Sequence, residues 1–142
     1  MNKVLLIHGP NLNLLGTREP EKYGSTSSEQ LLEQLNASSN DYTLDYFQSN
    51  SEAELVDAIQ QSKGVYAGII INPGAYSHTS IAIADAIRSV AVPAIAVHIS
   101  NIYQRESFRH ADLVGDACNG AIVGLGIAGY KIAFAHLTEE LI

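Results

Sequence analysis

Side chains that could exchange protons with a substrate gather in three segments of this chain, each directly after a short apolar run. Histidine, tyrosine and arginine suit acid–base chemistry on an anion, and asparagine and serine add hydrogen-bonding groups. The three segments cover residues 8–24, 72–79 and 98–110. Polar residues of these types in three separate segments predict one site for a small carboxylate or phosphate.

The first segment offers a candidate base, Tyr23, with Arg18 nearby in the sequence. A tyrosine acts as a base near neutrality only if a cation stabilises its phenolate, since its reference pKa is about 10. Arg18 is close enough to be that cation. We expect about residues 17–25, a charged stretch without apolar periodicity, to form a mobile lid. The alternative is a solvated loop with a packed tyrosine.

The third segment offers a candidate acid, His98, followed by Ile99 and Ser100. An imidazole at a strand end could donate a proton to a leaving hydroxyl, while backbone N–H groups beside it hold an anionic group. The alternative is a core histidine bonded to a carbonyl group. Arg105 and Arg109 are four residues apart, so in a helix they would share one face and favour an anion.

The second segment supplies hydrogen-bond donors at a predicted helix start. Asn72, Gly74 and His78 offer amide, backbone and imidazole donors to an anion or a hydroxyl group. Ordinary turn and N-cap chemistry explains the same residues equally well. On the helix that follows, Asp85 either pairs with Arg88 at the surface or meets a partner at a subunit boundary.

The elements that must position these residues alternate along the chain. Four apolar runs predict buried parallel strands, and a more polar, alternating run predicts an edge strand. In chain order the five runs cover residues 4–7, 43–47, 68–71, 94–97 and 121–123. Strands separated by helices predict one right-handed, doubly wound α/β domain over residues 1–142. In such a sheet, ligands bind at the carboxyl ends of the strands.

Helix starts are visible between these strands. The patterns at residues 26–29 and 51–54 have the spacing of capping boxes. Ser77 or Thr79 would cap a third helix over residues 80–90, and a fourth helix would cover residues 130–141.

Residues Gly124–Gly129 match G-x-G-x-x-G after a strand and before a helix, as in a dinucleotide site. That fingerprint needs an acidic residue about 20 positions on, and the sequence continues for only 13 residues. A flavodoxin-like module that binds a nucleotide or flavin at Gly124–Gly129 is kept as the alternative function. The simpler interpretation of these glycines is a tight turn with close packing.

Composition limits the function classes. The chain has 142 residues with 15 acidic and 8 basic side chains, and its net charge of −7 argues against nucleic acid and anionic membranes as partners. Charged residues make up only 16% and hydrophobic residues 46%, which favours surface hidden in a homo-oligomer. Cys118 has no ligand at metal-site spacing, so we expect no metal and a reduced, cytoplasmic setting. No apolar run reaches the length of a membrane span or a signal peptide.

Taken in order, these segments resemble the type II 3-dehydroquinate dehydratases, the small flavodoxin-like dehydroquinases of the shikimate pathway. The matching residues are 9–16, 18–20, 23–24, 47–50, 72–75, 77–80, 98–101, 105–106, 108–110, 124–126 and 129–130. The resemblance implies a three-layer α/β sandwich with a five-stranded parallel sheet in the order 2-1-3-4-5 and helices on both faces. It also implies a dodecamer built from trimers and a reaction without cofactor or metal.

The resemblance further implies an anti elimination of water from 3-dehydroquinate through an enolate, giving 3-dehydroshikimate. Tyr23 would remove the C2 proton, helped by Arg18. Asn11 would hold a water at the enolate oxygen, and His98 would protonate the departing hydroxyl. The implied substrate-binding residues, with Asp85 reaching in from a neighbouring subunit, are Asn72, Gly74, His78, Asp85, Ile99, Ser100, Arg105 and Arg109.

Two positions depart from the family pattern. The family often has Asn where this chain has His8, and it usually has Glu where this chain has Ala96. On a strand, residue 96 shares a face with His98, so a carboxylate there would orient the imidazole. With Ala96, either His98 is a poorer acid or another carboxylate substitutes. On sequence alone, we expect Ala96→Glu to raise kcat near neutral pH.

Overall fold

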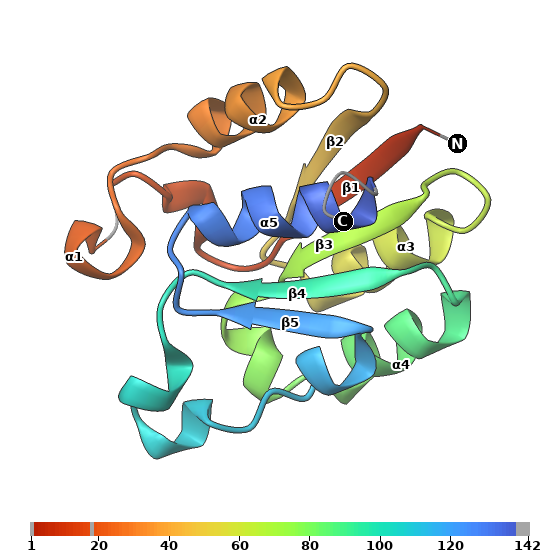
Figure 1. Cartoon of the computed structure of the whole chain (residues 1–142). Helices are drawn as coiled ribbons and strands as arrows, with labels where there is room; N and C mark the ends of the chain where they lie inside the picture. The colour runs from red at the N-terminus through yellow and green to blue at the C-terminus, as the bar shows by residue number, and fades with distance from the viewer. Residues whose placement is uncertain (1, 18, 139–142) are drawn as a thin grey trace.

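A five-stranded parallel sheet runs through the centre of the computed structural model, which describes residues 2–17 and 19–138 (Figure 1). The strand order is β2-β1-β3-β4-β5, which confirms the predicted order. The strands are β1 (Lys3–His8), β2 (Thr43–Gln48), β3 (Gly68–Asn72), β4 (Ala94–His98) and β5 (Gly120–Val123). Every residue of β3 and β4 is buried, whereas β2 is largely half-buried at one edge, as its alternating sequence predicts.

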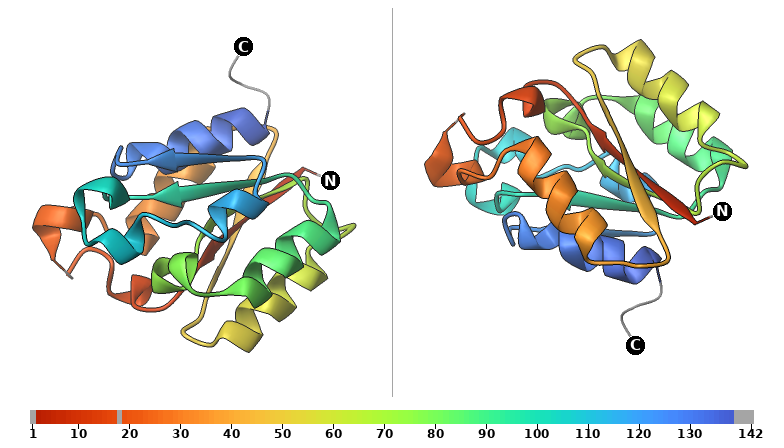
Figure 2. Two further views of the ribbon diagram at one scale, coloured as in Figure 1. Left: turned by 90° about the horizontal axis from the view of Figure 1, so that it is seen from below. Right: turned by 90° about the horizontal axis from the view of Figure 1, so that it is seen from above.

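Helices cover both faces of the sheet, so the predicted three layers are confirmed. The helices are α1 (Pro20–Tyr23), α2 (Ser28–Ala37), α3 (Glu52–Gln61), α4 (Ile81–Val90) and α5 (Ala128–Leu137). Figure 2 shows α2 and α5 on one side of the sheet and α3 and α4 on the other. Each side encloses its own apolar core, because alternate residues of every strand point to opposite faces. In the described part of the chain, no helix is long and apolar enough to cross a bilayer.

The helix caps differ slightly from the sequence prediction. Ser27 rather than Thr26 caps α2, because Ser27 Oγ accepts from the Gln30 backbone while the Gln30 side chain accepts from the Ser27 backbone. Ser51 caps α3 as predicted. Ser80 caps α4 by accepting a hydrogen bond from the Ile83 backbone at 3.0 Å, and Ser77 lies in the preceding turn. Helix α5 begins two residues earlier than predicted, and the predicted end of that helix lies outside the described residues.

Short 3₁₀ turns follow the strands at their carboxyl ends. They are η1 (Leu12–Leu14), η2 (Gly74–His78), η3 (Ile102–Gln104) and η4 (Ser107–Arg109), with η5 (Gly115–Ala117) before β5. Arg105 and Arg109 therefore do not share a helix face, since two separate turns replace the helix considered in the sequence analysis. Helix α1 and the turns after β4 lie beyond the strand ends, at the left of Figure 1.

The ends of β1 and β3 meet at one close contact. His8 pairs with Asn72 in the strand register, and the Gly9 backbone N–H donates to the Asn72 carbonyl at 2.9 Å. A Cβ on residue 9 would overlap the Pro73 carbonyl group, so only glycine fits this junction.

A buried chain of hydrogen bonds starts from Asn72. Its Nδ2 donates to Tyr130 OH at 2.9 Å, Tyr130 OH lies 2.9 Å from His8 Nε2, and His8 Nδ1 lies 2.9 Å from Tyr46 OH. Tyr46 in turn donates to Ser28 at 3.2 Å. Because the Tyr46 hydroxyl proton goes to Ser28, His8 Nδ1 carries a proton, and a neutral His8 then accepts at Nε2 from Tyr130 OH. Burial agrees, because it lowers the pKa of His8 to about 3.

The low pKa of His8 predicts that this residue makes the protein less stable in acid. The unfolded chain binds a proton at His8 near pH 6.5, whereas the folded chain does not until about pH 3. The contribution of His8 to the free energy of unfolding is therefore fully present above pH 6.5. Below that pH it falls by up to about 1.4 kcal/mol per pH unit. We expect His8→Gln to lose this slope, measured by urea unfolding at fixed protein concentration between pH 7 and 5. Equal slopes in His8→Gln, wild type and the exposed control His136→Gln would contradict the account.

Candidate active site

One cavity at the carboxyl edge of the sheet brings together ten of the twelve site residues predicted from the sequence. These ten are Asn11, Tyr23, Asn72, Gly74, His78, His98, Ile99, Ser100, Arg105 and Arg109. Arg18 lies outside the described residues, and Asp85 lies elsewhere on the surface. Segments that are far apart in the sequence therefore form one site, as the strand-end rule predicts.

Tyr23 enters the cavity from α1 and meets a cation there. Arg105 Nη1 donates to Tyr23 OH at 2.9 Å, and the guanidinium group also lies over the ring, 5.8 Å from its centroid. The same Nη1 lies 3.4 Å from Ser100 Oγ. Arg105 Nε is buried without a hydrogen bond to any residue that the structure describes. The sequence analysis expected Arg18 beside the phenol, and Arg105 is the cation in contact with it. A phenolate next to this guanidinium would form an attractive charge pair.

The Asn72 side chain is held at both of its ends. Its Nδ2 donates to Tyr130, and its Oδ1 accepts from the Gly74 backbone at 3.2 Å. An amide nitrogen carries two protons, so one N–H of Asn72 remains for a ligand. The buried chain through Tyr130 and His8 thus fixes the orientation of a group at the cavity wall.

Two histidines stand side by side in the cavity wall. The rings of His78 and His98 stack with their centroids 6.4 Å apart. His98 Nε2 lies 2.5 Å from Asp112 Oδ2, and His78 Nδ1 donates to the Ala111 carbonyl at 2.8 Å. Each histidine therefore has one nitrogen fixed by the loop after η4 and one nitrogen available to a ligand.

Arg109 brings a second cation to the cavity. Its Nε donates to Glu106 Oε2 at 2.6 Å, and its guanidinium group lies over Phe108. The backbone hydrogen bond at Glu106 and the Arg109 side chain lower the pKa of the Glu106 carboxyl. Arg109 and Arg105 give the cavity the positive groups that an anionic ligand needs.

Two other predicted residues differ in their placement. Asn11 is exposed in the left-handed region at φ 70°, and its backbone N–H donates to Asn50 Oδ1 at 3.1 Å. Asp85 lies on the outer surface of α4, with its side chain 68% exposed, and forms an ion pair with Arg88 at 3.8 Å. Within this chain the surface-pair interpretation of Asp85 is the one observed.

A larger depression lies between β2 and α3, with a volume of about 540 Å³. Its lining includes Glu54 and Asp57 and none of the predicted site residues. These carboxylates would repel an anion, so the smaller cavity at the strand ends, about 70 Å³, is the better candidate site.

The glycines at residues 124–129 have a structural role in the backbone. Gly124 has φ +83°, and a Cβ on Gly129 would lie 3.1 Å from Val97 Cγ1. These are the tight turn and close packing of the simpler interpretation. Among the described residues, no group of three His, Cys, Asp or Glu side chains could hold a metal ion.

Sequence reasoning did not single out Asp112, or Tyr130 as the buried partner of Asn72. Asp112 stands alone in a loop 14 residues after His98, and no spacing rule connects the two. Tyr130 follows Gly129 at a predicted helix start and reads there as a core residue. The one available signal was Ala96. Because alanine has no carboxylate to orient His98, another carboxylate elsewhere in the chain was one of the two alternatives.

Comparisons with known proteins agree on one family. The sequence model of the family described as "Dehydroquinase class II" matches residues 2–138. A 3-dehydroquinate dehydratase from Bacillus cytotoxicus is 51% identical over 143 residues, covering 99% of this chain and 98% of the relative. The type II dehydroquinase structure from Butyrivibrio crossotus has a TM-score of 0.91 at 45% identity, covering 95% of this chain and 96% of that one. The one from Propionibacterium acnes has a TM-score of 0.92 at 39% identity, covering 98% and 97%. The chain belongs to the class II dehydroquinase family.

Proposed function

We infer that this chain removes water from 3-dehydroquinate to give 3-dehydroshikimate, as a hydro-lyase of the shikimate pathway. The observation that carries the proposal is a single cavity holding a tyrosine against a guanidinium group and a histidine against a carboxylate. The first pair suits removal of a proton, and the second suits protonation of a leaving group. The family of the chain agrees with this reaction.

In the first step Tyr23 takes the C2 proton of the substrate. The electron pair of the broken C–H bond moves into an enolate on the neighbouring ketone. Arg105, which touches the Tyr23 hydroxyl, favours the phenolate that acts as the base. Arg18 adds a second cation in this proposal, and Asn11 holds a water that donates to the enolate oxygen. Donors fixed in advance stabilise such an enolate better than bulk water does.

In the second step the enolate collapses and the hydroxyl group β to the ketone departs. His98 gives that oxygen a proton, so the products are water and a conjugated enone. His98 Nε2 is occupied by Asp112, and Nδ1 is the nitrogen that acts on the substrate. Elimination is anti because the base and the acid approach opposite faces of the ring.

The remaining cavity residues bind the substrate. The free N–H of Asn72 and the backbone at Ile99 and Ser100 hold its carboxylate, next to Gly74. His78 and Arg109 engage the ring hydroxyls, and Arg105 adds positive charge. The proposal uses no metal or cofactor, and it gives residues 124–129 the structural role of a tight turn with close packing.

A lid at about residues 17–25 completes the proposal. The cavity of about 70 Å³ is smaller than the roughly 150 Å³ cavity that holds a benzene ring, so a substituted six-membered ring needs more room. Tyr23 on α1 closes it through its contact with Arg105. Opening of this segment therefore admits the substrate, and closing places the base.

Assembly extends the proposal beyond one chain. We place Asp85 at a ring hydroxyl in the cavity of a neighbouring subunit, since its side chain is exposed and lies outside its own cavity. The proposed assembly is a dodecamer built from trimers, and the proposed location is the cytoplasm.

Tyr23→Phe tests the assignment of the base. We expect kcat for enone formation, followed by ultraviolet absorbance, to fall about 1,000-fold or more because the proton acceptor is lost. Binding of the product, measured by calorimetry, should persist. The control Tyr103→Phe removes an exposed hydroxyl from η3 and should leave kcat within twofold. Retained turnover in Tyr23→Phe would contradict the assignment.

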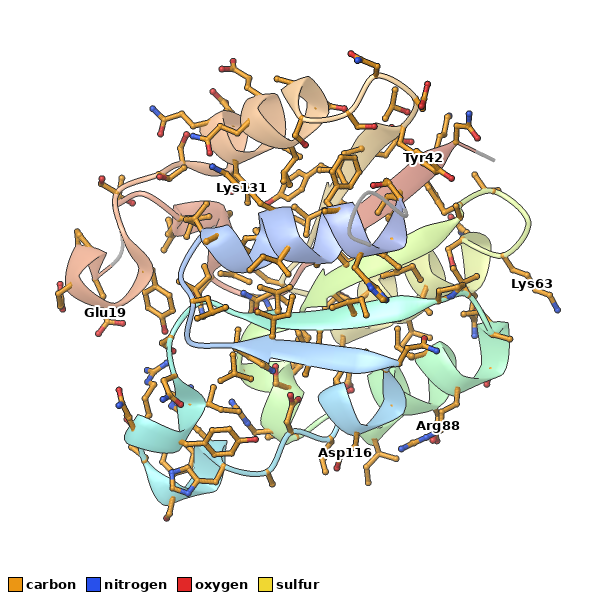
Figure 3. All side chains as sticks on the ribbon, viewed as in Figure 1. Glu19, Tyr42, Lys63, Arg88, Asp116 and Lys131 are labelled. Carbon is orange, nitrogen blue, oxygen red and sulfur yellow. The ribbon has the colours of Figure 1, made fainter. Side chains whose placement is uncertain are left out.

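The inactive Tyr23→Phe complex also reports on the lid. Arg18 and Lys22 are trypsin sites within the proposed lid, and Lys63 lies in an exposed turn elsewhere (Figure 3). Saturating product should slow cleavage at the lid sites and leave cleavage at Lys63 unchanged. Equal cleavage with and without product would contradict the lid.

Asp85→Ala tests the shared site. We expect KM to rise about tenfold, because a hydrogen bond to a charged group is lost. The control Asp57→Ala removes another exposed carboxylate, on α3, and should leave KM unchanged. Light scattering should give a mass that is a multiple of three chains. A monomeric enzyme, or an unchanged KM, would contradict this role of Asp85.

A further inference from the structure

We propose that Asp112 is the positioning residue for His98, supplying from a loop the carboxylate that fixes which imidazole nitrogen faces the substrate. The proposal rests on the proposed function, because it concerns the group that protonates the leaving hydroxyl. Asp112 does not line the cavity, so it acts through His98 and makes no contact with the substrate.

The contact between the two side chains is short and shielded from water. Asp112 Oδ2 lies 2.5 Å from His98 Nε2, and the side chains are only 12% and 5% exposed, respectively. A carboxylate only accepts, so Nε2 carries the proton in this pair. The His98 side chain makes no other hydrogen bond to a residue that the structure describes. Nδ1 is then left for the substrate, and an imidazolium ion, once formed, is stabilised by the adjacent charge.

The loop that carries Asp112 is fastened on both sides of this residue. Asp112 Oδ1 accepts from the Gly115 backbone at 2.9 Å, and the Asp112 carbonyl accepts from the Asp116 backbone at 3.0 Å. The Leu113 backbone donates to the Ser77 carbonyl at 2.8 Å, and the Ala111 carbonyl accepts from His78. Both neighbours of Asp112 are thus tied to η2, which itself forms part of the cavity wall.

Charges around the pair agree with an ionised Asp112. Burial opposes the charged form, but hydrogen bonding and charge from His98, the Gly115 N–H and the charge of His78 together lower the pKa of Asp112 below its usual value. Burial and the Asp112 charge raise the pKa of the neighbouring Cys118 thiol to about 12, so Cys118 stays neutral. Arg105 and Arg109 are the other charged groups that line the same cavity as His98.

Ala96 explains why the carboxylate must come from this loop. Residue 96 lies two positions before His98 on β4, on the same strand face, and is fully buried in an apolar cluster with Val114. Because His98 Nε2 already has a partner, we no longer expect Ala96→Glu alone to raise kcat. A second buried carboxylate beside Asp112 would be repelled by it.

Three variants test whether the Asp112 carboxylate acts on His98 or only stabilises the fold. Asp112→Asn keeps an oxygen for the Gly115 N–H and turns an N–H₂ group toward His98. Gly115→Ala keeps Asp112 but adds a Cβ that would overlap Asp112 Oδ2 and displace the carboxylate. The double variant Asp112→Ala with Ala96→Glu moves the carboxylate to β4, and Asp112→Ala alone is its reference. The matched control is Asp116→Ala, which removes an exposed acid from the same loop (Figure 3).

Steady-state kinetics with 3-dehydroquinate across pH is the first readout. We expect Asp112→Asn and Gly115→Ala to lower kcat about 10- to 100-fold with KM changed less than threefold, the size typical of a lost orienting partner. The double variant should recover at least tenfold over Asp112→Ala, and Asp116→Ala should match wild type. Wild-type kcat in folded Asp112→Asn and Gly115→Ala would overturn the proposal.

Nitrogen NMR of histidine-labelled protein gives a second readout that needs no substrate. His98, assigned by its loss in His98→Gln, should carry its proton on Nε2 in wild type and shift toward Nδ1 in Asp112→Asn. An unchanged tautomer would overturn the proposal even if kcat fell. If wild type shows this tautomer but never turns over 3-dehydroquinate, the proposed function fails while the positioning contact stands.

Discussion

The backbone hydrogen bond from Gly9 to the Asn72 carbonyl joins the ends of β1 and β3, and the candidate site is built around this junction. It exists because two apolar strands pair in parallel and because residue 9 has no side chain to collide with Pro73. From this edge the loop after β1 leads to Asn11 and Tyr23, and the loop after β3 leads to His78. Small changes in strand register would separate these groups, so the apolar core indirectly fixes the chemistry.

Side chains of the cavity wall are held in place by hydrogen bonds from residues that lie outside the cavity. Asn72 is fixed by Tyr130, which is itself held by the neutral His8. His98 is held by Asp112. Both supports lie in water-poor surroundings, where an unsatisfied polar group is costly and a satisfied one keeps its geometry. The site therefore needs little rearrangement of its walls, which is why we propose the lid in the segment that carries Tyr23.

Apolar runs and turn residues were enough to predict the strands and the edge at which the site lies, whereas the strand order followed from the family resemblance. The caps were less certain, because Thr26 with Glu29 and Ser27 with Gln30 fit the same capping pattern, and only the backbone geometry selects the second pair. Ten site residues could be predicted because their segments lie at or after the carboxyl ends of strands and match the family that the chain resembles. Arg105 beside Tyr23 and Asp112 beside His98 could not, because these contacts join residues 82 and 14 positions apart through loops without a periodic pattern.

Water elimination with the base and the acid on opposite faces of the substrate is the central claim. The most direct measurement uses 3-dehydroquinate carrying deuterium at C2 on the face opposite the leaving hydroxyl, with the product analysed by mass spectrometry. Anti elimination through Tyr23 and His98 predicts a product that has lost the deuterium. A product that retains it would contradict the account.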